Sequence, residues 1–382
     1  MNGVSVSVEA LVEELRVQGH SVHVFTTRYP GHRDQDPNIW RFPSIRLPFF
    51  PQYPFAIPPF YGSLRHFRAH DFDIIHTHTP YTVGFVGLRW AESHNIPIVT
   101  TYHTLYERYA HYVPYFPKVY VRYKVARHTN YYYNRVAHVI TPSEAAFTSL
   151  RRQSVNTPIT IIPTGNPPVK EISRDSARKM MGAREGERAL LYVGRISREK
   201  NITLLLDAVA QVMKNRSDTR LWMVGDGPDR LPAQKYARAL GIGDRVKFVG
   251  AVPREQVDMY YAGSDLFVFA STTETQGLVI GEAMTHGLPA VAARGGGASD
   301  NISDGETGII VGSSVAQIAD AIEHLLDNPN LLAQLGDNCR EFSRSWTHAE
   351  SCKRVLSVYQ SVLGQEPVAE ESLVHSRTNR TV

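Results

Sequence analysis

Residues 265–293 read DLFVFASTTETQGLVIGEAMTHGLPAVAA. A short apolar run is followed by a polar loop, a helix-length segment and a second short apolar run, which is the pattern of a βα unit on a parallel sheet. Glu274 lies in the loop, and Glu282 lies inside the following helix. Each carboxylate can accept hydrogen bonds from separate hydroxyls of one ligand. The stretch therefore predicts an α/β fold with a ligand site at the carboxyl end of a strand.

Both acids could instead be ordinary surface residues. That alternative is weaker for Glu282, because Val279, Ile280, Ala283 and Met284 surround it in the sequence. An amphipathic helix leaves such a residue little room on its exposed face.

Working outward, similar apolar runs alternate with amphipathic segments along almost the whole chain, which predicts two doubly wound domains. Residues 41–62 interrupt this pattern, because they are rich in proline. Proline donates no backbone hydrogen bond, so these residues cannot form a central strand or a helix. The predicted strands are residues 21–26, 72–77, 96–102, 137–141 and 159–162 in the first half, and 189–194, 220–225, 245–250, 265–270, 289–293 and 308–311 in the second.

Length and composition agree with this organisation. A chain of 382 residues has room for two domains. Its 42% hydrophobic and 20% charged residues argue against wholesale disorder and against an integral membrane architecture. The predicted division is an N-terminal domain of residues 1–166, a C-terminal domain of residues 187–346, a helix of residues 347–363 that can pack back toward the first domain, and a disordered tail of residues 364–382.

The two cysteines and the N-terminus indicate the compartment. Cys339 and Cys352 have no CxxC motif or Cys/His cluster around them, so neither a disulfide framework nor a zinc site is expected. No secretory signal pattern opens the chain. We therefore expect a cytoplasmic protein.

Two further strand-to-helix junctions carry candidate ligand groups. Gly194 ends a predicted strand, and Arg195 and Lys200 bracket the turn before the next helix, where two cations and backbone amides can bind a diphosphate. A solvated Arg/Lys pair is an equally good interpretation of these residues alone. Gly225 and Gly227 permit close approach of a ligand, or simply form a tight structural turn.

Five segments together resemble the signature set of a known family. GRISREKN, GDGP, FVGAVPREQV, ETQGLVIGEAM and ARGGGASDNISDGETGIIV occur in this order. The series is similar to that of the retaining glycosyltransferases of family 4, which use nucleotide-sugar donors. This resemblance implies the GT-B fold, in which two Rossmann-like domains face each other across a cleft.

The resemblance also implies roles for particular residues. Arg195 and Lys200 would neutralise the donor diphosphate, Glu282 would hold the ribose hydroxyls, and the base would lie near Val252. Glu274 and the adjacent QGL segment would hold the donor sugar. The residues expected to bind the donor are Gly3, Gly194, Arg195, Lys200, Gly225, Val252, Glu274, Gln276, Gly277, Leu278 and Glu282.

The first half supplies a candidate catalytic histidine. His103 follows the predicted strand of residues 96–102, at the edge that would face the cleft. A single histidine is more often structural, but the family places a matching histidine beside the transferred sugar. We therefore predict His103 at the transfer site, together with Glu274, Arg195 and Lys200. His78, in the segment HTHTP, is a second candidate that would contact the acceptor.

No metal or cofactor is expected for the reaction. The pair Asp34 and Asp36 falls in a polar loop, and the pair Asp71 and Asp73 precedes a strand at its wrong end. The cations already named would supply the positive charge for the leaving nucleoside diphosphate.

Tyrosines and basic residues are concentrated in residues 105–136. Such a mixture is expected of a contact with an anionic membrane surface. Tyrosines packed inside the domain are the main alternative, and nucleic-acid binding is a distant third. The residues predicted to contact the acceptor or the membrane are Tyr106, Tyr109, Arg122, Lys124 and Arg127.

The chain begins almost directly in an amphipathic helix. A doubly wound domain ordinarily opens with a strand and a glycine-rich turn, and that strand normally lies in the middle of the sheet. We expect a misplaced start codon or a truncated gene, with about ten to twenty residues missing ahead of Met1 and Gly3 left as part of a loop facing the cleft.

Within the family, HTLYERYAHYVP and ETQGL most resemble diacylglycerol glucosyltransferases and allied lipid enzymes. The expected function is the retaining transfer of a hexose, with UDP-glucose favoured, to a membrane lipid hydroxyl at the inner face of the membrane. GDP-mannose or another donor with a non-lipid acceptor is an alternative. A nucleotide-sugar epimerase, a dinucleotide-dependent oxidoreductase and a non-enzymatic membrane-surface protein are rivals from other classes.

Overall fold

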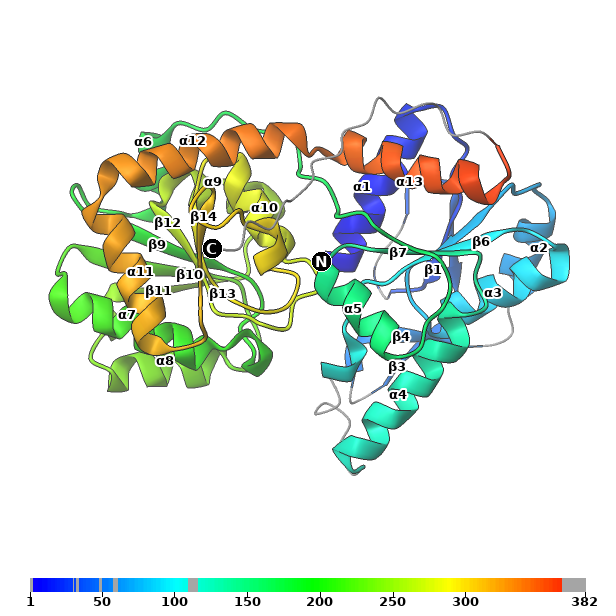
Figure 1. The fold of residues 1–382 in the computed structure, drawn as a ribbon, viewed down its shortest axis with the longest axis horizontal. Coiled ribbons are helices and arrows are strands. Elements are labelled where there is room, and N and C mark those ends of the chain that lie inside the picture. Colours follow the sequence, from blue (N-terminus) through cyan, green and yellow to red (C-terminus); the bar gives the residue numbers. More distant parts are fainter. Residues whose placement is uncertain are drawn as a thin grey trace, which may run out of the picture.

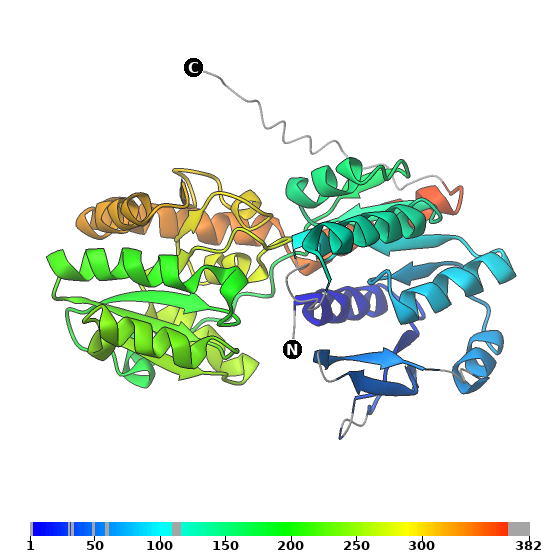
Figure 2. The same ribbon diagram turned by 90° about the horizontal axis from the view of Figure 1, so that it is seen from below.

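The computed structural model describes residues 3–29, 31, 34–47, 50–57, 61–108 and 116–365. Two α/β domains lie side by side, with the N-terminal domain on the right of Figure 1 and the C-terminal domain on the left. Figure 2 shows helices on both sides of the C-terminal sheet. The fold class predicted from the alternating pattern is confirmed.

The C-terminal domain is built on one parallel sheet of six strands, in the order β11-β10-β9-β12-β13-β14. The residues of the four central strands are almost all buried, as expected for strands covered by helices on both faces, whereas the edge strands are mostly half-buried. The strands are β9 (Arg188–Val193), β10 (Thr219–Val224), β11 (Val246–Gly250), β12 (Leu266–Phe269), β13 (Ala290–Ala293) and β14 (Gly308–Val311).

Helices cover both faces of this sheet. One group packs α7 against α8 and α11, and another packs α6 against α9 and α10 against α12. The helices are α6 (Arg174–Met181), α7 (Ile202–Asn215), α8 (Arg230–Ala239), α9 (Arg254–Gly263), α10 (Leu278–Thr285), α11 (Val315–Asp327) and α12 (Pro329–Ser345), with short 3₁₀ turns η2 (Arg198–Lys200), η3 (Gly243–Arg245) and η4 (Ser299–Asn301).

The N-terminal domain has a parallel sheet of four strands, in the order β5-β6-β7-β8, and two smaller sheets. Strands β1 and β2 form a separate parallel pair, and β3 and β4 form an antiparallel pair. The strands are β1 (Val24–Thr27), β2 (Ile39–Phe42), β3 (Ser44–Leu47), β4 (Phe50–Ala56), β5 (Ile75–Thr77), β6 (Ile98–Thr101), β7 (His138–Thr141) and β8 (Ile159–Ile161), and the helices are α1 (Gly3–Val17), α2 (Tyr61–Arg68), α3 (Thr82–His94), α4 (Lys118–Tyr133) and α5 (Glu144–Arg152).

The parallel strands that the structure describes in the N-terminal domain do not form one continuous sheet, because β1 and β5 are not paired. Within the described ranges, β1 pairs only with β2 and β5 pairs only with β6, so no ladder joins the two sheets. A doubly wound domain would ordinarily have one continuous sheet here. The expectation of a strand ahead of Gly3 stays a prediction.

The proline-rich residues 41–62 form more regular structure than the sequence indicated. They contribute the end of β2, the hairpin β3–β4 and the start of α2. The hairpin is a peripheral sheet of two strands, where each strand needs only one hydrogen-bonded partner, so proline is tolerated in β4.

The chain crosses between the domains twice. After β8 it enters the C-terminal domain, where α6 lies inside the interval of residues 167–186 that the sequence left between domains. After α12 it returns, and α13 (His348–Val362) packs against α1 on the N-terminal domain (Figure 1). The two crossings touch, because Asn166 donates its amide to the Trp346 carbonyl at 2.8 Å and accepts from the His348 amide at 3.2 Å.

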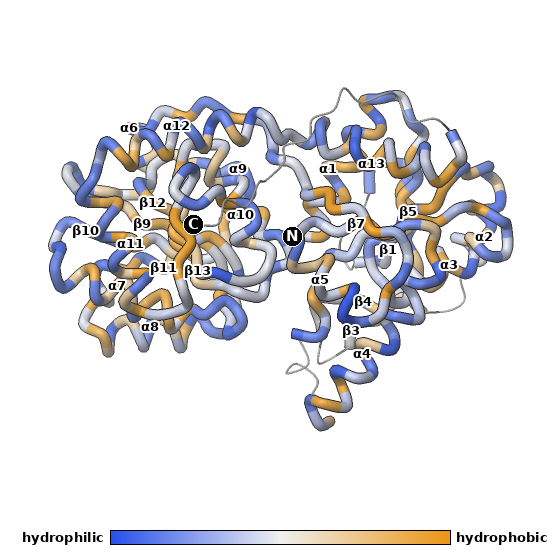
Figure 3. Tube along the Cα trace, in the orientation of Figure 1, coloured by the Kyte–Doolittle hydropathy of each residue, from blue (hydrophilic) through white to orange (hydrophobic). Residues whose placement is uncertain are grey.

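Hydrophobic residues run through the interior of both domains (Figure 3). Cys339 and Cys352 are both buried and not bonded to each other. Among the described residues, no helix is both long enough and apolar enough to span a bilayer.

Candidate active site

The candidate site lies where the two domains meet. From the C-terminal domain, the loop after β12 reaches the N-terminal domain, and Gln276 donates to the Thr164 carbonyl at 2.8 Å and accepts from the Thr164 amide at 3.0 Å. Arg108 in turn donates to the Thr272 carbonyl. These contacts bring the ends of strands from both domains to one place.

Lys200 and Glu274 meet directly in this region. Lys200 ends the 3₁₀ turn η2 after β9, and its Nζ donates to Oε1 of Glu274, which lies in the loop after β12. Both side chains are largely buried. Arg195, on the same loop as Lys200, has an exposed side chain. A cation and a carboxylate predicted from two distant motifs are thus neighbours, as one ligand contacting both would require.

The glycines at the ends of β9 and β10 have a packing role. Gly225 has a φ of +134°, and a Cβ there would lie 2.0 Å from the Gly194 carbonyl oxygen. A Cβ on Gly227 would lie 2.2 Å from the Ile196 carbonyl oxygen. The loops after β9 and β10 touch through their backbones, and a side chain at either glycine would prevent this contact. The glycines therefore allow a close structural turn. The turn lies beside the residues that the resemblance assigns to donor binding.

The loop that carries Glu274 is held by the glycine run of residues 295–297. The Gly297 amide donates to the Glu274 carbonyl at 2.7 Å, and a Cβ on Gly296 would lie 2.8 Å from the same oxygen. Asn301 donates to the Gln276 carbonyl. The sequence contained this run only as part of the family signature, and its support of the Glu274 loop was not predicted.

Glu282 is a buried carboxylate with two protein partners. Arg254 donates to its Oε1 at 2.6 Å, and the Tyr261 hydroxyl donates to its Oε2 at 2.9 Å. Burial, followed by the nearby Glu282 charge, raises the pKa of Tyr261 well above its ordinary value. Arg254 and Tyr261 were missed by the sequence analysis, although Arg254 lies in the quoted segment FVGAVPREQV. Each carboxylate oxygen retains further acceptor capacity. A ribose contact at Glu282 therefore stays a prediction.

The start of α10 is the point where the N-terminus of the chain approaches this loop. Gly277 precedes α10 with a φ of +76°, and its Cβ would lie 2.9 Å from Ala298 Cβ. A Cβ on Gly3 would lie 3.6 Å from Leu278 Cδ1. Gly3 thus lies beside the predicted donor loop. Val252 follows β11 and is half-buried against the C-terminal core.

Two predicted histidines of the N-terminal domain form a pair. His78 follows β5 and His103 follows β6, and His78 Nδ1 lies 2.9 Å from His103 Nε2. Burial lowers the pKa of His78 to about 4, and burial, followed by the His78 charge, lowers the pKa of His103 well below its usual value. Both imidazoles are therefore neutral at pH 7 and share one hydrogen bond.

A third histidine, His76 of β5, lies next to the His78 ring. Its Nδ1 lies 2.6 Å from the Tyr359 hydroxyl of α13, and its Nε2 lies 2.7 Å from Thr101 Oγ1. The His76 and His78 rings are 4.2 Å apart. The packing of α13 on the N-terminal domain therefore supports the histidine pair from behind.

The tyrosine-rich segment divides into a buried part and an exposed part. Tyr132 and Tyr133 are fully buried in the N-terminal core, and Tyr106 packs on Tyr81 and Tyr102. The sequence alternative of tyrosines packed inside the domain is therefore right for Tyr132 and Tyr133, and the predicted acceptor contact of Tyr106 stays a prediction. Tyr109 lies outside the described residues.

The exposed part is the first half of α4, which extends beyond the sheet in Figure 1. Phe116, Val119, Tyr120 and Tyr123 have exposed fractions of 58%, 79%, 47% and 58%. Arg122, Lys124 and Arg127 are exposed beside them, and Lys124 Nζ lies 5.5 Å from the centre of the Tyr120 ring. We call these residues, with Lys118, the α4 patch.

The aspartate pairs considered for a metal lie away from this region. Asp34 accepts from Arg41 at 2.6 and 2.7 Å, and Asp36 forms an ion pair with Arg16 at 2.7 Å. Asp71 and Asp73 are exposed at the start of the β5 segment.

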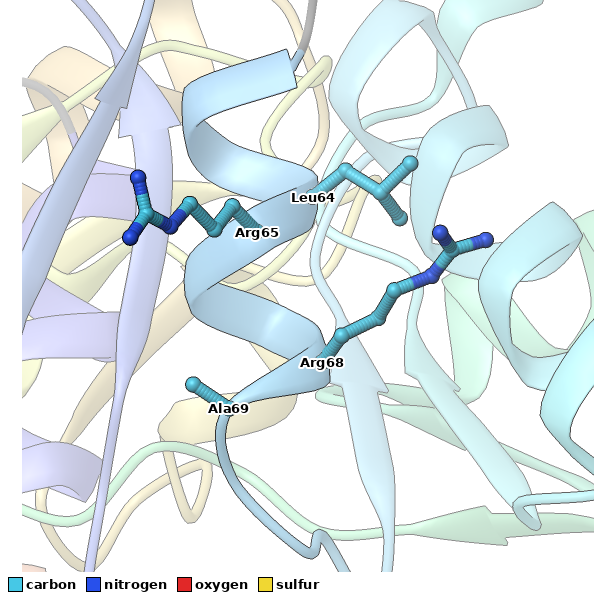
Figure 4. Close-up of a pocket in the computed structure, with 4 residues that line it drawn as sticks. All are labelled: Leu64, Arg65, Arg68 and Ala69. Atoms are coloured by element: carbon cyan, nitrogen blue, oxygen red, sulfur yellow. The ribbon is translucent and has the colours of Figure 1, made fainter.

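A hollow on the surface of the N-terminal domain is separate from the candidate site. It is lined by Leu64, Arg65, Arg68 and Ala69 at the C-terminal end of α2, and Figure 4 shows Arg65 and Arg68 pointing to different sides of the helix. Helix α2 lies on the side of the N-terminal domain farthest from the C-terminal domain (Figure 1).

Comparisons with known proteins cover both domains. Residues 1–168 match the family described as Glycosyltransferase Family 4, and residues 173–342 match the family described as Glycosyl transferases group 1. The alpha-monoglucosyldiacylglycerol synthase of Streptococcus pneumoniae is 32% identical, over 100% of this chain and 88% of that protein. The alpha-monoglucosyldiacylglycerol synthase of Acholeplasma laidlawii is 30% identical, over 92% of each. Among solved structures, sucrose-phosphate synthase from Thermosynechococcus elongatus superposes with a TM-score of 0.79 at 25% identity, over 95% of this chain and 94% of that one.

Proposed function

The chain belongs to glycosyltransferase family 4 and is a hexosyltransferase with the GT-B fold, and we propose that it transfers glucose from UDP-glucose to the hydroxyl of a membrane lipid such as diacylglycerol, with retention of configuration. The observation that carries this proposal is the likeness, over nearly the whole chain, to two proteins named alpha-monoglucosyldiacylglycerol synthase. The lipid acceptor, the donor and the stereochemistry are all part of the proposal.

In the first step the C-terminal domain binds the donor. Glu282 accepts hydrogen bonds from ribose hydroxyls, with the base near Val252. Arg195 and Lys200 neutralise the diphosphate. Because Lys200 contacts Glu274, a sugar diphosphate can place its phosphate oxygens on Lys200 and its sugar hydroxyls on Glu274 and the Gln276–Leu278 backbone.

In the second step the acceptor hydroxyl oxygen attacks the anomeric carbon from the face that the diphosphate leaves. The bond from this carbon to the diphosphate oxygen breaks, and the hydroxyl proton passes to the departing diphosphate. The charge on the leaving group increases in the transition state, where fixed cations stabilise it more than in the ground state. A neutral His103, held by His78 at 2.9 Å, can hydrogen-bond the transferring sugar without adding a charge beside the oxocarbenium-like carbon. We propose that no metal or other cofactor takes part.

The acceptor reaches the site from a membrane surface. The α4 patch combines exposed aromatic rings with basic side chains, which is the composition that binds at the headgroup level of anionic membranes. We place the enzyme at the cytoplasmic face of the membrane, with its diacylglycerol substrate in the same leaflet and no nucleic-acid partner.

A donor-release assay tests the proposal. The full chain is incubated with UDP-glucose, UDP-galactose, GDP-mannose or GDP-glucose, each with anionic vesicles that contain or lack diacylglycerol. We expect UDP release and an α-linked glucolipid only with UDP-glucose and diacylglycerol together.

Each alternative has its own outcome in the same assay. Product formed from GDP-mannose would show that GDP-mannose is the donor in place of UDP-glucose. Turnover at the same rate with and without diacylglycerol would show that diacylglycerol is not the acceptor. A free sugar-nucleotide isomer formed from donor alone would identify an epimerase.

A further inference from the structure

Three histidines outside the candidate active site have the arrangement of a metal-binding site. His23, His66 and His70 each offer a ring nitrogen, and these three atoms lie within 4.8 Å of one another. His23 lies directly before β1, while His66 and His70 lie four residues apart on α2 and the turn that follows it. The sequence analysis did not predict this group, because His23 is 43 positions from His66.

The distances fit a four-coordinate zinc ion. His23 Nδ1 and His66 Nε2 share a hydrogen bond 3.1 Å long, which bonds from both nitrogens to an ion would replace. Zn–N bonds of about 2.0–2.1 Å place neighbouring ligand nitrogens of a tetrahedral site about 3.3–3.4 Å apart. A small movement of the third ring would therefore bring all three nitrogens to bonding distance.

The surroundings orient the rings and keep them available. His70 Nδ1 bonds to the His66 carbonyl at 2.9 Å, which leaves Nε2 of His70 as its free nitrogen. A hydrogen bond of this kind from the second ring nitrogen commonly orients a metal-binding histidine. The Trp40 ring stacks on His66 at 3.6 Å and restricts its rotation.

One side of the cluster is open to solvent. Residues 69–71 are exposed, so an ion and a water ligand can reach the site from solvent.

We propose that His23, His66 and His70 form a zinc site that stabilises the N-terminal domain, with water as the fourth ligand. The site lies at the amino end of β1, whereas His78 and His103 follow the carboxyl ends of β5 and β6, so the ion takes no part in sugar transfer. It joins the start of β1 to the end of α2. That link holds the β1–β2 pair, which has no ladder to β5 among the described residues, in place against the domain.

Equilibrium dialysis of the full chain, without an affinity tag and after removal of metals by a chelator, tests the proposal with Zn²⁺ as the added metal. We expect one zinc per chain. His66→Gln and His70→Gln should each weaken binding by at least about tenfold. His324→Gln, at an exposed position of α11, is the matched control and should bind zinc as the natural chain does.

A second measurement separates site loss from misfolding. Co²⁺ at the site should quench Trp40 fluorescence through its contact with His66, and His70→Gln should weaken that quenching while donor binding by the C-terminal domain is retained. Zinc binding that is unchanged in His70→Gln, or that depends on His78 instead, would overturn the proposal. So would the absence of stoichiometric binding by the natural chain.

Discussion

Lys200 is the residue whose charge we expect to matter most in turnover. Lys200→Ala removes one fixed cation from the leaving diphosphate, which should raise the barrier by about 2–4 kcal/mol. Initial rates at saturating donor measure the effect. Lys235→Ala, an exposed lysine of α8, is the control and should leave the rate unchanged. An unchanged rate in Lys200→Ala with folding intact would contradict the assignment.

Glu282 should act on stability as well as on donor binding. Its carboxylate accepts from Arg254 and Tyr261, so Glu282→Gln should cost about 1–3 kcal/mol of unfolding free energy. Urea unfolding of Glu282→Gln, Arg254→Gln and the double variant gives the coupling between the two residues. Additive losses of unfolding free energy would show that the ion pair contributes nothing to stability. UDP binding that is weaker in Glu282→Gln but not in Arg254→Gln would support the ribose contact.

The histidine pair predicts a pH dependence of stability. The pKa of His78 is lowered to about 4 in the folded chain, against about 6.5 in an unfolded one. The unfolded state therefore takes up the proton first, and stability is lost as pH falls from about 6.5 toward 4, by up to about 1.4 kcal/mol per pH unit. Chemical unfolding of His78→Gln between these values should show a shallower slope than the natural chain. Equal slopes would mean that His78 titrates normally.

At the scale of elements, the α4 patch predicts electrostatic membrane binding. Replacing Arg122, Lys124 and Arg127 with Ser should weaken binding to phosphatidylserine vesicles by about 1 kcal/mol per charge. Vesicle sedimentation at low and high salt measures this loss of binding. High salt should weaken the binding of the natural chain in the same way. The matched control replaces three exposed basic residues of the other domain, Lys214, Lys235 and Arg238, with Ser. Equal losses in both variants would point to net charge rather than the patch.

The gap between β1 and β5 predicts uneven amide exchange. The Ile75 amide donates to the Pro97 carbonyl at 2.9 Å, on the side of β6. Because successive amides of a strand point to opposite sides, the His76 amide points away from β6. We expect this amide to exchange at least about tenfold faster than that of Thr100, in a strand paired on both sides. Hydrogen exchange followed by NMR measures both. Equal protection would show that another strand covers the edge of β5.

All the parallel strands except β2 (Ile39–Phe42) were predictable, because buried parallel strands are short apolar runs, and their limits in the structure differ from the expected ones by at most a few residues. The hairpin β3–β4 was not, since its register depends on a partner strand that proline content does not reveal. At the site, Lys200 and Glu274 were found through their motifs. Arg254 and Tyr261 were missed because their function depends on a contact across 28 and 21 positions with Glu282, which no local pattern contains.

At the scale of the whole molecule, the double crossing limits how the two domains can move. The two connections are hydrogen-bonded at Asn166, Trp346 and His348, so they form one pivot rather than two separate tethers. Because the two connections lie side by side, sliding of one domain past the other would stretch both of them, whereas rotation about this point changes the length of neither. We expect opening to admit a nucleotide-sugar, and closing around it, to be such a rotation, with the arc of motion largest at the loops farthest from Asn166.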